Sequence, residues 1–456
     1  KMCACYSIDK GECLGEGGWG TVRKARLKGC QLSRAIKEVP KGSIKDQEDV
    51  HREIAILRTL DHPNICRLYE THENKRSIFL VMEYIEGREL FDEMEENIRT
   101  GRHNMDRCSE IMRQVFGALH YCHEHEVLHR DLKPENIMVV SPNNSCDGHA
   151  CVGPSIKLID FGMAVASEKS ADSEGCKQIH GSGVVGTRPY LAPEVWASHT
   201  YSGASDMWAT GIILYVMLMG RFPEEGNKTR LIHEISTTTG RDLVSGLLKT
   251  DPSERPSAAQ AARHPWSTDN KNWIRHEATA DELKKVTSSF VDFHKSNKLQ
   301  KAALTALASQ TSGQQMFALG QSFHMMDTDG NGVITKAELL AAFEKAPPSG
   351  ITNVSEWVED IFDELDSNGS GELDFTEWEA AAMRSFANVS EEAMRAAFHV
   401  LDADHTGTIS VQELSRIMPM VNQHELLTAI EEVDLNGDGV IDFTEFSMMM
   451  TKALGA

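Results

Sequence analysis

The 456-residue chain lacks any apolar run long enough to cross a bilayer, so we expect no transmembrane segment. Its most apolar stretch, residues 212–219, predicts a buried core helix instead. The ten cysteines form no C-x-x-C pair, which is typical of ordinary thiols in a reducing compartment and argues against a disulfide framework or a zinc site. We therefore expect a cytoplasmic protein. The chain begins with Lys1 rather than Met, and we expect any N-terminal acylation that attaches it to a membrane to lie before this residue.

Basic residues are scarce in the last third of the chain. From Phe317 to the end there are 26 acidic residues against 6 Lys and Arg, whereas the part before Phe317 has 42 against 40. The net charge of -22 is therefore concentrated in the last third. Such a segment would repel nucleic acid and anionic lipid, and it suits cations or basic peptides. We expect no nucleic-acid partner, while a merely solvated acidic surface is the alternative that charge alone leaves open.

A glycine-rich motif lies near the start, where residues 15–22 read Gly-Glu-Gly-Gly-Trp-Gly-Thr-Val. In dinucleotide-binding folds the last glycine of such a motif opens a helix. Here residues 21–27 alternate like a strand, which favours a glycine-rich hairpin over phosphates. A predicted strand then carries Lys37, and a predicted helix over 51–57 carries Glu53. A lysine held by a glutamate can grip the phosphates of a nucleotide.

The strongest motif is His-Arg-Asp-Leu-Lys-Pro-Glu-Asn at residues 129–136. In it Asp131 would orient a substrate hydroxyl and accept its proton, and Asn136 would ligate a magnesium ion. Asp160 begins an Asp-Phe-Gly motif and would hold the magnesium that bridges the phosphates. An Ala-Pro-Glu motif at 192–194 closes the segment, and we expect Glu194 to form a structural ion pair with Arg255.

These motifs, in this order, resemble the eukaryotic protein kinases over residues 6–266. The resemblance implies an α+β bilobal fold with ATP and Mg²⁺ between the lobes, and Lys133 implies a Ser/Thr acceptor. Met82 would be the gatekeeper, with residues 83–85 as the hinge. Glu89 and Glu135 would favour protein substrates with basic residues near the target Ser or Thr, although Glu89 could equally be a solvated glutamate at a helix start. The implied ATP-binding residues are Gly15, Gly17, Gly20, Val22, Ala35, Lys37, Glu53, Met82, Glu83 and Ile85.

Several segments depart from the kinase pattern. Arg88 stands where a second glycine is usual. Segments 141–155 and 166–185 are longer than usual, and the second contains serines that could be phosphosites, although loop serines usually are not. Between Phe222 and Arg241 the chain is about one helix short of the pattern, because the enzyme lacks part of its substrate-docking floor or because residues are missing from the sequence. The serines of segment 166–185 considered as phosphosites are Ser167, Ser170, Ser173 and Ser182.

The acidic last third contains four matches to the EF-hand loop, at 327–338, 366–377, 402–413 and 434–445. Each match has a central glycine that permits a sharp turn and a glutamate at position 12 that can supply two oxygens to calcium. An apolar residue at position 8 of each loop suits the pairing of loops. Four matches in register predict an all-α domain with four calcium sites. The candidate Ca²⁺ ligands are Asp327, Asp329, Asn331, Val333 and Glu338; Asp366, Asn368, Ser370, Glu372 and Glu377; Asp402, Asp404, Thr406, Thr408 and Glu413; and Asp434, Asn436, Asp438, Val440 and Glu445.

The segment between these two parts, 281–308, reads as one long basic amphipathic helix. Apolar residues recur every three or four positions from Leu283 to Leu307, and lysines such as Lys298 and Lys301 add positive charge. A helix of this type is the usual target of a calmodulin-like groove, although a plain packing helix would show the same spacing.

The whole chain thus resembles the calcium-dependent protein kinases of plants and protists, with a kinase domain at 6–266, a junction at 267–316 and a calmodulin-like domain at 317–456. The resemblance implies a monomer in which the junction blocks the cleft without calcium and is held elsewhere with calcium. We expect Lys298 or Lys301 to lie against Glu89 or Glu135 in the inhibited state. A calcium-sensing pseudokinase scaffold and a kinase with non-regulatory EF-hands are the alternatives, and the intact catalytic residues argue against the first.

Overall fold

The structure is a computed structural model that describes residues 5–17, 20–29, 32–42, 44–101, 104–140, 154–167, 178–181, 183–223, 232–268, 280–311, 314–385, 389–418 and 422–454. Most of the two long segments and part of the short segment noted above lie outside these residues. Of the four serines considered as phosphosites, only Ser167 is described, and it is buried.

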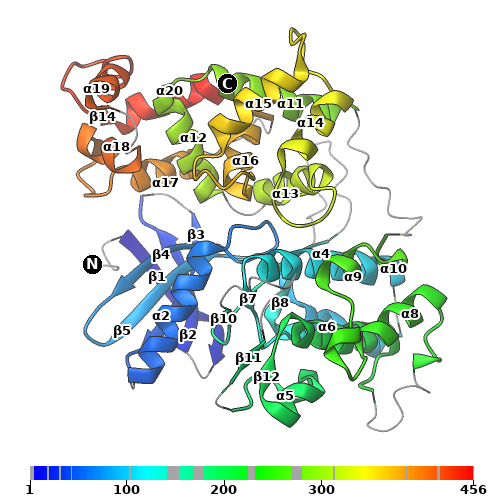
Figure 1. Cartoon of the computed structure of the whole chain (residues 1–456). Helices are drawn as coiled ribbons and strands as arrows, with labels where there is room; N and C mark the ends of the chain where they lie inside the picture. Colours follow the sequence, from blue (N-terminus) through cyan, green and yellow to red (C-terminus); the bar gives the residue numbers. More distant parts are fainter. Residues whose placement is uncertain are drawn as a thin grey trace.

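The first lobe is a five-stranded antiparallel sheet with strand order β1-β2-β3-β5-β4, flanked by helix α2 (Figure 1). Strand β5 is a nearly continuous apolar run that pairs with β3, Ala35 with Met82 and Ile36 with Val81, so the middle of the sheet is buried. The elements are β1 (Tyr6–Gly17), β2 (Gly20–Leu27), β3 (Ser33–Pro40), α2 (Ile44–Thr59), β4 (Leu68–Glu73) and β5 (Ser77–Glu83).

The second lobe is helical and is built around α6, whose side chains are buried from Ser205 to Leu218. This confirms the core helix predicted for 212–219. No helix in the described part of the chain is both long and apolar enough to span a membrane. The helices are α3 (Leu90–Thr100), α4 (Met105–Glu124), α5 (Pro193–Ser198), α6 (Gly203–Met219), α8 (Thr238–Leu247), α9 (Ala258–Ala262) and α10 (Pro265–Thr268).

Short strands lie between the two lobes and in the segment that follows the Asp-Phe-Gly motif. Strands β6, β8 and β9 form one small sheet, β7 pairs with β10, and β11 pairs with β12. Short 3-10 helices at Pro134–Asn136, Arg188–Tyr190 and Pro252–Glu254 complete the lobe. The strands are β6 (Arg88–Glu89), β7 (Val127–Leu128), β8 (Ile137–Val140), β9 (Ser155–Leu158), β10 (Val165–Ala166), β11 (Ile179–His180) and β12 (Thr200–Tyr201).

The segment 281–308 contains a helix break, between α11 (Ala280–Lys295) and α12 (Lys298–Gln310), so the prediction of a single helix is wrong. The break comes from side-chain hydrogen bonds to the main chain, which the spacing of apolar residues does not reveal. The Asn297 side chain accepts a hydrogen bond from the Gln300 amide, and the Gln300 side chain accepts one from the Asn297 amide. This capping box starts a new helix at Lys298.

The last part contains four helix-loop-helix units. Their loops pair as predicted at position 8, Ile334 with Leu373 and Ile409 with Ile441. The elements are α13 (Gln314–Met326), α14 (Lys336–Lys345), α15 (Val354–Leu365), α16 (Phe375–Ala382), a 3-10 turn (Met383–Ser385), α17 (Glu391–Leu401), β13 (Thr408–Ile409), α18 (Val411–Ile417), α19 (Gln423–Glu431), β14 (Ile441–Asp442) and α20 (Phe443–Leu454).

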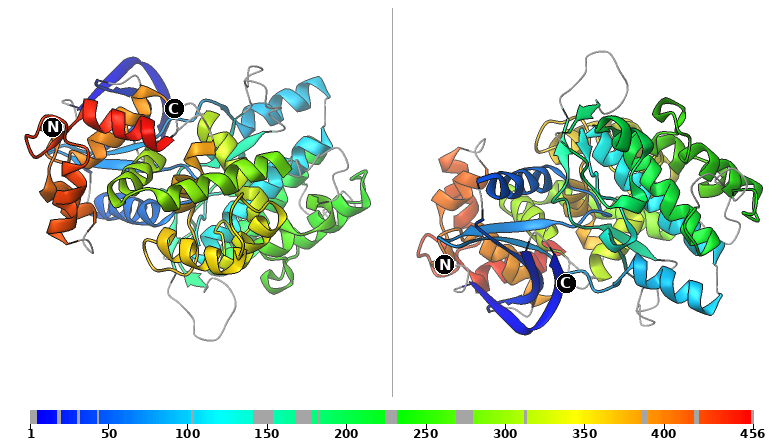
Figure 2. Two further views of the ribbon diagram at one scale, coloured as in Figure 1. Left: turned by 90° about the horizontal axis from the view of Figure 1, so that it is seen from above. Right: turned by 90° about the horizontal axis from the view of Figure 1, so that it is seen from below.

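The junction and the EF-hand helices form a layer against one side of the two-lobed part, whereas β11, β12 and α5 lie on the opposite side (Figure 1). Seen from above, this layer lies in front of part of the two lobes, and seen from below the two lobes lie in front of much of it (Figure 2). Apolar residues of the first lobe, such as Phe79 and Val81, join residues of α12 and the EF-hands in one hydrophobic core. Burial of apolar surface therefore holds the layer in place.

Candidate active site and calcium loops

A buried lysine connects the first lobe to the cleft. The Lys37 Nζ lies 2.6 Å from Glu53 Oε1 on α2 and 3.2 Å from Asp160 Oδ1. Lys37 and Glu53 are buried, whereas 41% of the Asp160 side chain is exposed toward the cleft. Although burial opposes it, Lys37 holds the pKa of Asp160 below its usual value, so this carboxylate stays ionised. The arrangement places one fixed cation beside one exposed carboxylate, which suits phosphates and a bridging magnesium ion.

Asp131 lies at the centre of a second polar cluster. Its Oδ2 accepts a hydrogen bond from Lys133 Nζ at 2.9 Å, and its Oδ1 accepts from the Thr187 amide at 2.8 Å and hydroxyl at 2.7 Å. Lys133 also donates to the Thr187 hydroxyl at 3.2 Å. A carboxylate held from two sides in this way has a defined orientation toward the cleft.

The amide of Asn136 donates to the main-chain oxygen of Asp131 at 2.8 Å. That bond uses the amide nitrogen and leaves the amide oxygen as the group that can ligate magnesium, together with the Asp160 carboxylate. The residues present therefore fit a magnesium-nucleotide complex.

Two residues that the sequence analysis missed position this cluster. Thr187 holds Asp131, and its only signal was its place five residues before the Ala-Pro-Glu motif. Asp206, at the start of α6, accepts hydrogen bonds from the His129 amide at 3.1 Å and the Arg130 amide at 2.9 Å. Its other partner is His123 Nε2 at 3.0 Å. A single buried Asp has no sequence signal of its own.

The predicted nucleotide-binding positions line up along the sheet. Gly15 pairs with Val22, and Gly17 pairs with Gly20, at the hairpin between β1 and β2, while residues 18–19 lie outside the described part. Gly20 has a φ of 133°, and a Cβ there would lie 2.2 Å from the main-chain oxygen of Glu38. Only glycine fits this close approach.

The first residue of the predicted hinge, Glu83, uses its side chain in a contact within the protein. The Glu83 carboxylate lies 2.7 Å from Lys157 Nζ in a buried ion pair, so its side chain is not available to adenine. The main chain of residues 83–85 is then the part that can meet a nucleotide. Ala35 and Met82 are paired across β3 and β5 beside this hinge.

Glu89 and Glu135 lie near each other. Partial burial, with Asp92 and Glu135 nearby, raises the pKa of Glu89. Within the described residues, the buried Oε2 of Glu135 has no hydrogen-bond partner. An unpaired buried carboxylate oxygen beside a second carboxylate suits a guanidinium from a basic substrate. The unusual Arg88 instead pairs with Glu96 at 2.6 Å and with Glu93 at 3.5 Å.

The predicted pair of Glu194 and Arg255 is confirmed as a bidentate one, at 2.6 and 2.7 Å. The Arg255 side chain is fully buried and also donates to three main-chain oxygens. These contacts fasten the Ala-Pro-Glu segment to the second lobe, which is a structural role.

The four EF-hand loops share one hydrogen-bond pattern. In the first loop, Asp327 accepts the amides of Gly330 at 2.7 Å and Gly332 at 3.0 Å, and Glu338 accepts those of Thr328 at 2.8 Å and Thr335 at 3.0 Å. In the other three loops, too, main-chain amides of the loop donate to the first aspartate and to the last glutamate. All four loops therefore turn these carboxylates inward.

The inward carboxylates fit a divalent cation. Ligand oxygens of Asp327, Asp329 and Glu338 lie within 4.8 Å of one another, as do those of Asp402, Asp404 and Glu413. Burial, together with Glu338 and Asp329, raises the pKa of Asp327 to about 8. Grouped and partly buried carboxylates of this kind are stabilised by a hard cation that takes oxygen ligands, and calcium has that chemistry.

The fourth loop is expected to be among the tighter calcium sites, because it carries the carboxylates of Asp434, Asp438, Asp442 and Glu445. The third loop has Thr406 and Ser410 at positions 5 and 9. Calcium titrations of single Glu→Gln variants check this expectation. Glu445→Gln should remove a tighter site than Glu413→Gln, and the reverse order would contradict the prediction.

Arg67 connects the two parts of the molecule. Its guanidinium contacts Asp61 at 3.2 Å, Glu379 on α16 at 3.4 Å, and the main-chain oxygen of Ala308 on α12 at 2.9 Å. Asp61 in turn accepts the Thr376 amide at 2.8 Å. Glu379 is fully buried, and burial raises its pKa to about 7 even though Arg67 opposes the rise. A single buried network thus joins the loop after α2 to the junction and the EF-hands.

His62 lies in the same contact region, and burial lowers its pKa far below the usual value, with His324, Lys157, His125 and His120 adding to this effect. The folded protein keeps His62 neutral, whereas the unfolded chain binds a proton below about pH 6.5. Stability that depends on neutral His62 is complete above this pH and is lost as the pH falls.

We therefore expect His62→Asn to reduce the loss of thermal stability on acidification below about pH 6.5, by up to about 1.4 kcal/mol per pH unit for one proton. Melting temperatures between pH 5.5 and 7.5 measure this. His233→Asn, at an exposed position, serves as the control. Equal pH profiles for His62→Asn and the unaltered protein would contradict the expectation.

Comparisons with known proteins agree with this geometry. Residues 8–267 match the family described as "Protein kinase domain", and residues 316–383 and 391–451 match "EF-hand domain pair". The chain is 32% identical to calcium-dependent protein kinase 5 of Plasmodium falciparum, over 98% of this chain and 78% of that protein. It is 33% identical to calcium-dependent protein kinase 3 of Plasmodium berghei, over 98% and 80% of the two chains.

A plant protein is equally similar. Calcium-dependent protein kinase 19 of Arabidopsis thaliana is 32% identical, over 98% of this chain and 80% of its own length. The matches run through the kinase part, the junction and the EF-hands together. The chain belongs to the calcium-dependent protein kinases, enzymes that combine a Ser/Thr protein kinase domain with calcium-binding EF-hands.

Proposed function

We propose that this chain transfers the γ-phosphate of ATP to Ser or Thr residues that lie near basic residues in protein substrates, and that calcium on its EF-hands controls the transfer. One observation carries the catalytic part: Lys37, Glu53 and Asp160 are joined at 2.6 and 3.2 Å, beside an oriented Asp131. This arrangement suits a kinase that is competent for transfer. Asp131 would act as the base, Lys133 and Thr187 would position it, and Asn136 and Asp160 would hold Mg²⁺.

The control would depend on where the junction lies. Lys298 forms an ion pair with Glu425, and Lys301 forms one with Glu364, both on the EF-hands. Helix α12 packs against α16, α17, α19 and α20, so both EF-hand pairs enclose it. In this arrangement the two lysines have partners on the EF-hands rather than Glu89 or Glu135. Calcium would favour it by binding more tightly to EF-hands that hold the junction.

Without calcium, the junction would instead lie against the cleft, with a junction lysine against Glu89 or Glu135. Charge supports this alternative position. Glu89 and Glu135 at the cleft offer carboxylates to the same two lysines that pair with Glu425 and Glu364 on the EF-hands. A Lys298→Glu variant should then raise calcium-free activity, since it weakens the inhibitory contact. Unchanged low activity without calcium would count against Lys298.

The deciding experiment measures phosphate transfer from ATP to a basic Ser/Thr peptide, in EGTA and in micromolar calcium. We expect strong stimulation by calcium. Equal activity in both buffers would leave a kinase whose EF-hands do not regulate it. No activity in either buffer, with calcium binding intact, would favour a pseudokinase scaffold. We also expect a monomer in the cytoplasm, which sedimentation and cell fractionation would check.

A further inference from the structure

The third calcium loop differs from the others at its fourth position. The first, second and fourth loops have Gly330, Gly369 and Gly437 there, all in the left-handed region with φ between 70° and 74°. The third loop has His405 at this position with a φ of 60°. A side chain is strained in this region relative to glycine, although histidine tolerates it better than most residues. An imidazole held at a strained position points to a role for the imidazole.

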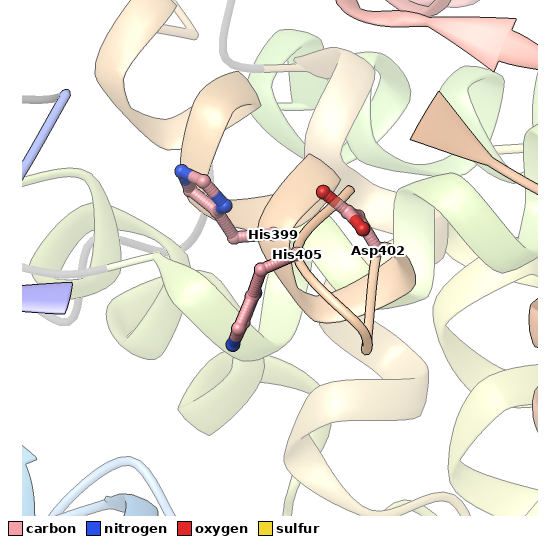
Figure 3. A group of neighbouring side chains, drawn as sticks. All are labelled: His399, Asp402 and His405. Carbon is pink, nitrogen blue, oxygen red and sulfur yellow. The ribbon is translucent and has the colours of Figure 1, made fainter. Parts of the chain in front are cut away.

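A second histidine lies beside the first. His399 is on the last turn of α17, three residues before Asp402, the first residue of the loop. The rings of His399 and His405 have centroids 6.2 Å apart. One ligand atom from each histidine and one carboxylate oxygen of Asp402 all lie within 4.8 Å of one another. Figure 3 shows the three side chains on α17 and the loop that follows it.

We propose that His399, Asp402 and His405 bind a divalent transition-metal ion of the zinc class. Two imidazole nitrogens and one carboxylate oxygen are ligands that zinc accepts readily, whereas calcium takes oxygen ligands. Tetrahedral zinc with bonds of about 2.1 Å places its ligand atoms about 3.4 Å apart. Both imidazoles reach solvent, so rotation of their side chains closes the remaining distance, and water supplies the fourth ligand.

Asp402 belongs to both sites. It is buried, and its two oxygens accept the amides of Thr406 at 3.0 Å and Gly407 at 2.9 Å, as the first calcium ligand of the loop does elsewhere. Zinc and calcium therefore compete for one carboxylate. Besides Asp402, the third loop offers the carboxylates of Asp404 and Glu413 to calcium. Zinc lowers the calcium affinity of this loop and leaves the other three loops unchanged.

The variant His405→Gly gives the sharpest test, because it installs the residue that the other loops have and keeps every candidate calcium ligand of the third loop. The full-length, calcium-free chain is titrated with Zn²⁺ against a chromophoric chelator. We expect the unaltered chain to bind one more zinc ion than His405→Gly, or to bind it at least tenfold more tightly. His399→Gln should give the same loss. His424→Gln, at an exposed position on α19, should bind zinc like the unaltered chain.

A calcium titration completes the test. One equivalent of zinc should weaken one calcium site of the unaltered chain and none in His405→Gly. Equal zinc binding by the two proteins, or none in either, would overturn the zinc site. Zinc binding that leaves the calcium titration of the unaltered chain unchanged would overturn the shared carboxylate.

Discussion

Asp131→Asn is expected to lower kcat by a factor on the order of 10² to 10⁴, the range typical of a lost general base, while KM for ATP changes little. The carboxylate accepts bonds from Lys133 and from both the amide and the hydroxyl of Thr187. An asparagine keeps one accepting oxygen, so the fold is retained, but it cannot take a proton from the substrate hydroxyl. Phosphate transfer in saturating calcium, with ATP varied, measures the split between kcat and KM.

The matched control is Asp242→Asn in the same lobe, where the carboxylate is 80% exposed and its partner is His264 at 3.2 Å. This variant should transfer phosphate at the unaltered rate. Calcium binding and the melting temperature should be the same for both variants. A kcat within a few-fold of the unaltered value in Asp131→Asn would show that another group accepts the proton.

Arg67→Ala is expected to abolish most of the stimulation by calcium and to lower the melting temperature. Arg67 is the cation in a network with the fully buried Glu379 and the partly buried Asp61, and its removal leaves the Glu379 carboxylate buried without a cation. Loss of one partner from a buried ion pair costs about 3–5 kcal/mol. The same variant removes the bond to the main-chain oxygen of Ala308, which fixes the end of α12 against the first lobe.

Hydrogen exchange in two helices distinguishes undocking of α12 from unfolding of the whole protein. Hydrogen exchange of the α12 amides should rise in Arg67→Ala, while amides of α6 in the second lobe remain protected. Arg384→Ala is the control, because it removes an exposed pair with Asp292 at 3.3 Å, and such pairs contribute about 0–1 kcal/mol. Glu379→Gln keeps the shape and removes only the carboxylate, so its effect should be smaller than that of Arg67→Ala. Full calcium stimulation in Arg67→Ala would exclude the network as the docking contact.

The capping box at Asn297 shows why apolar spacing was insufficient at the junction. Residues on both sides of the break are buried at the predicted spacing, among them Val286, Phe290 and Leu299. The direction of the chain nonetheless changes there, because two side chains satisfy two main-chain amides better than a continued helix would. A hydrophobic period reports which face is buried, and it does not report where one helix stops and the next begins.

The sequence alone determined the two kinds of chemistry, phosphate transfer with magnesium and the binding of calcium. Each depends on residues at fixed short spacings. The phosphate-binding and magnesium-binding groups lie in motifs of three to eight residues, and each calcium loop is complete within twelve. Only the tertiary structure decided how these parts are positioned. Thr187 beside Asp131, Lys157 beside Glu83, and Arg67 beside Glu379 join residues that are 56, 74 and 312 positions apart. Such pairs have no local pattern, because packing brings them together only after the chain has folded.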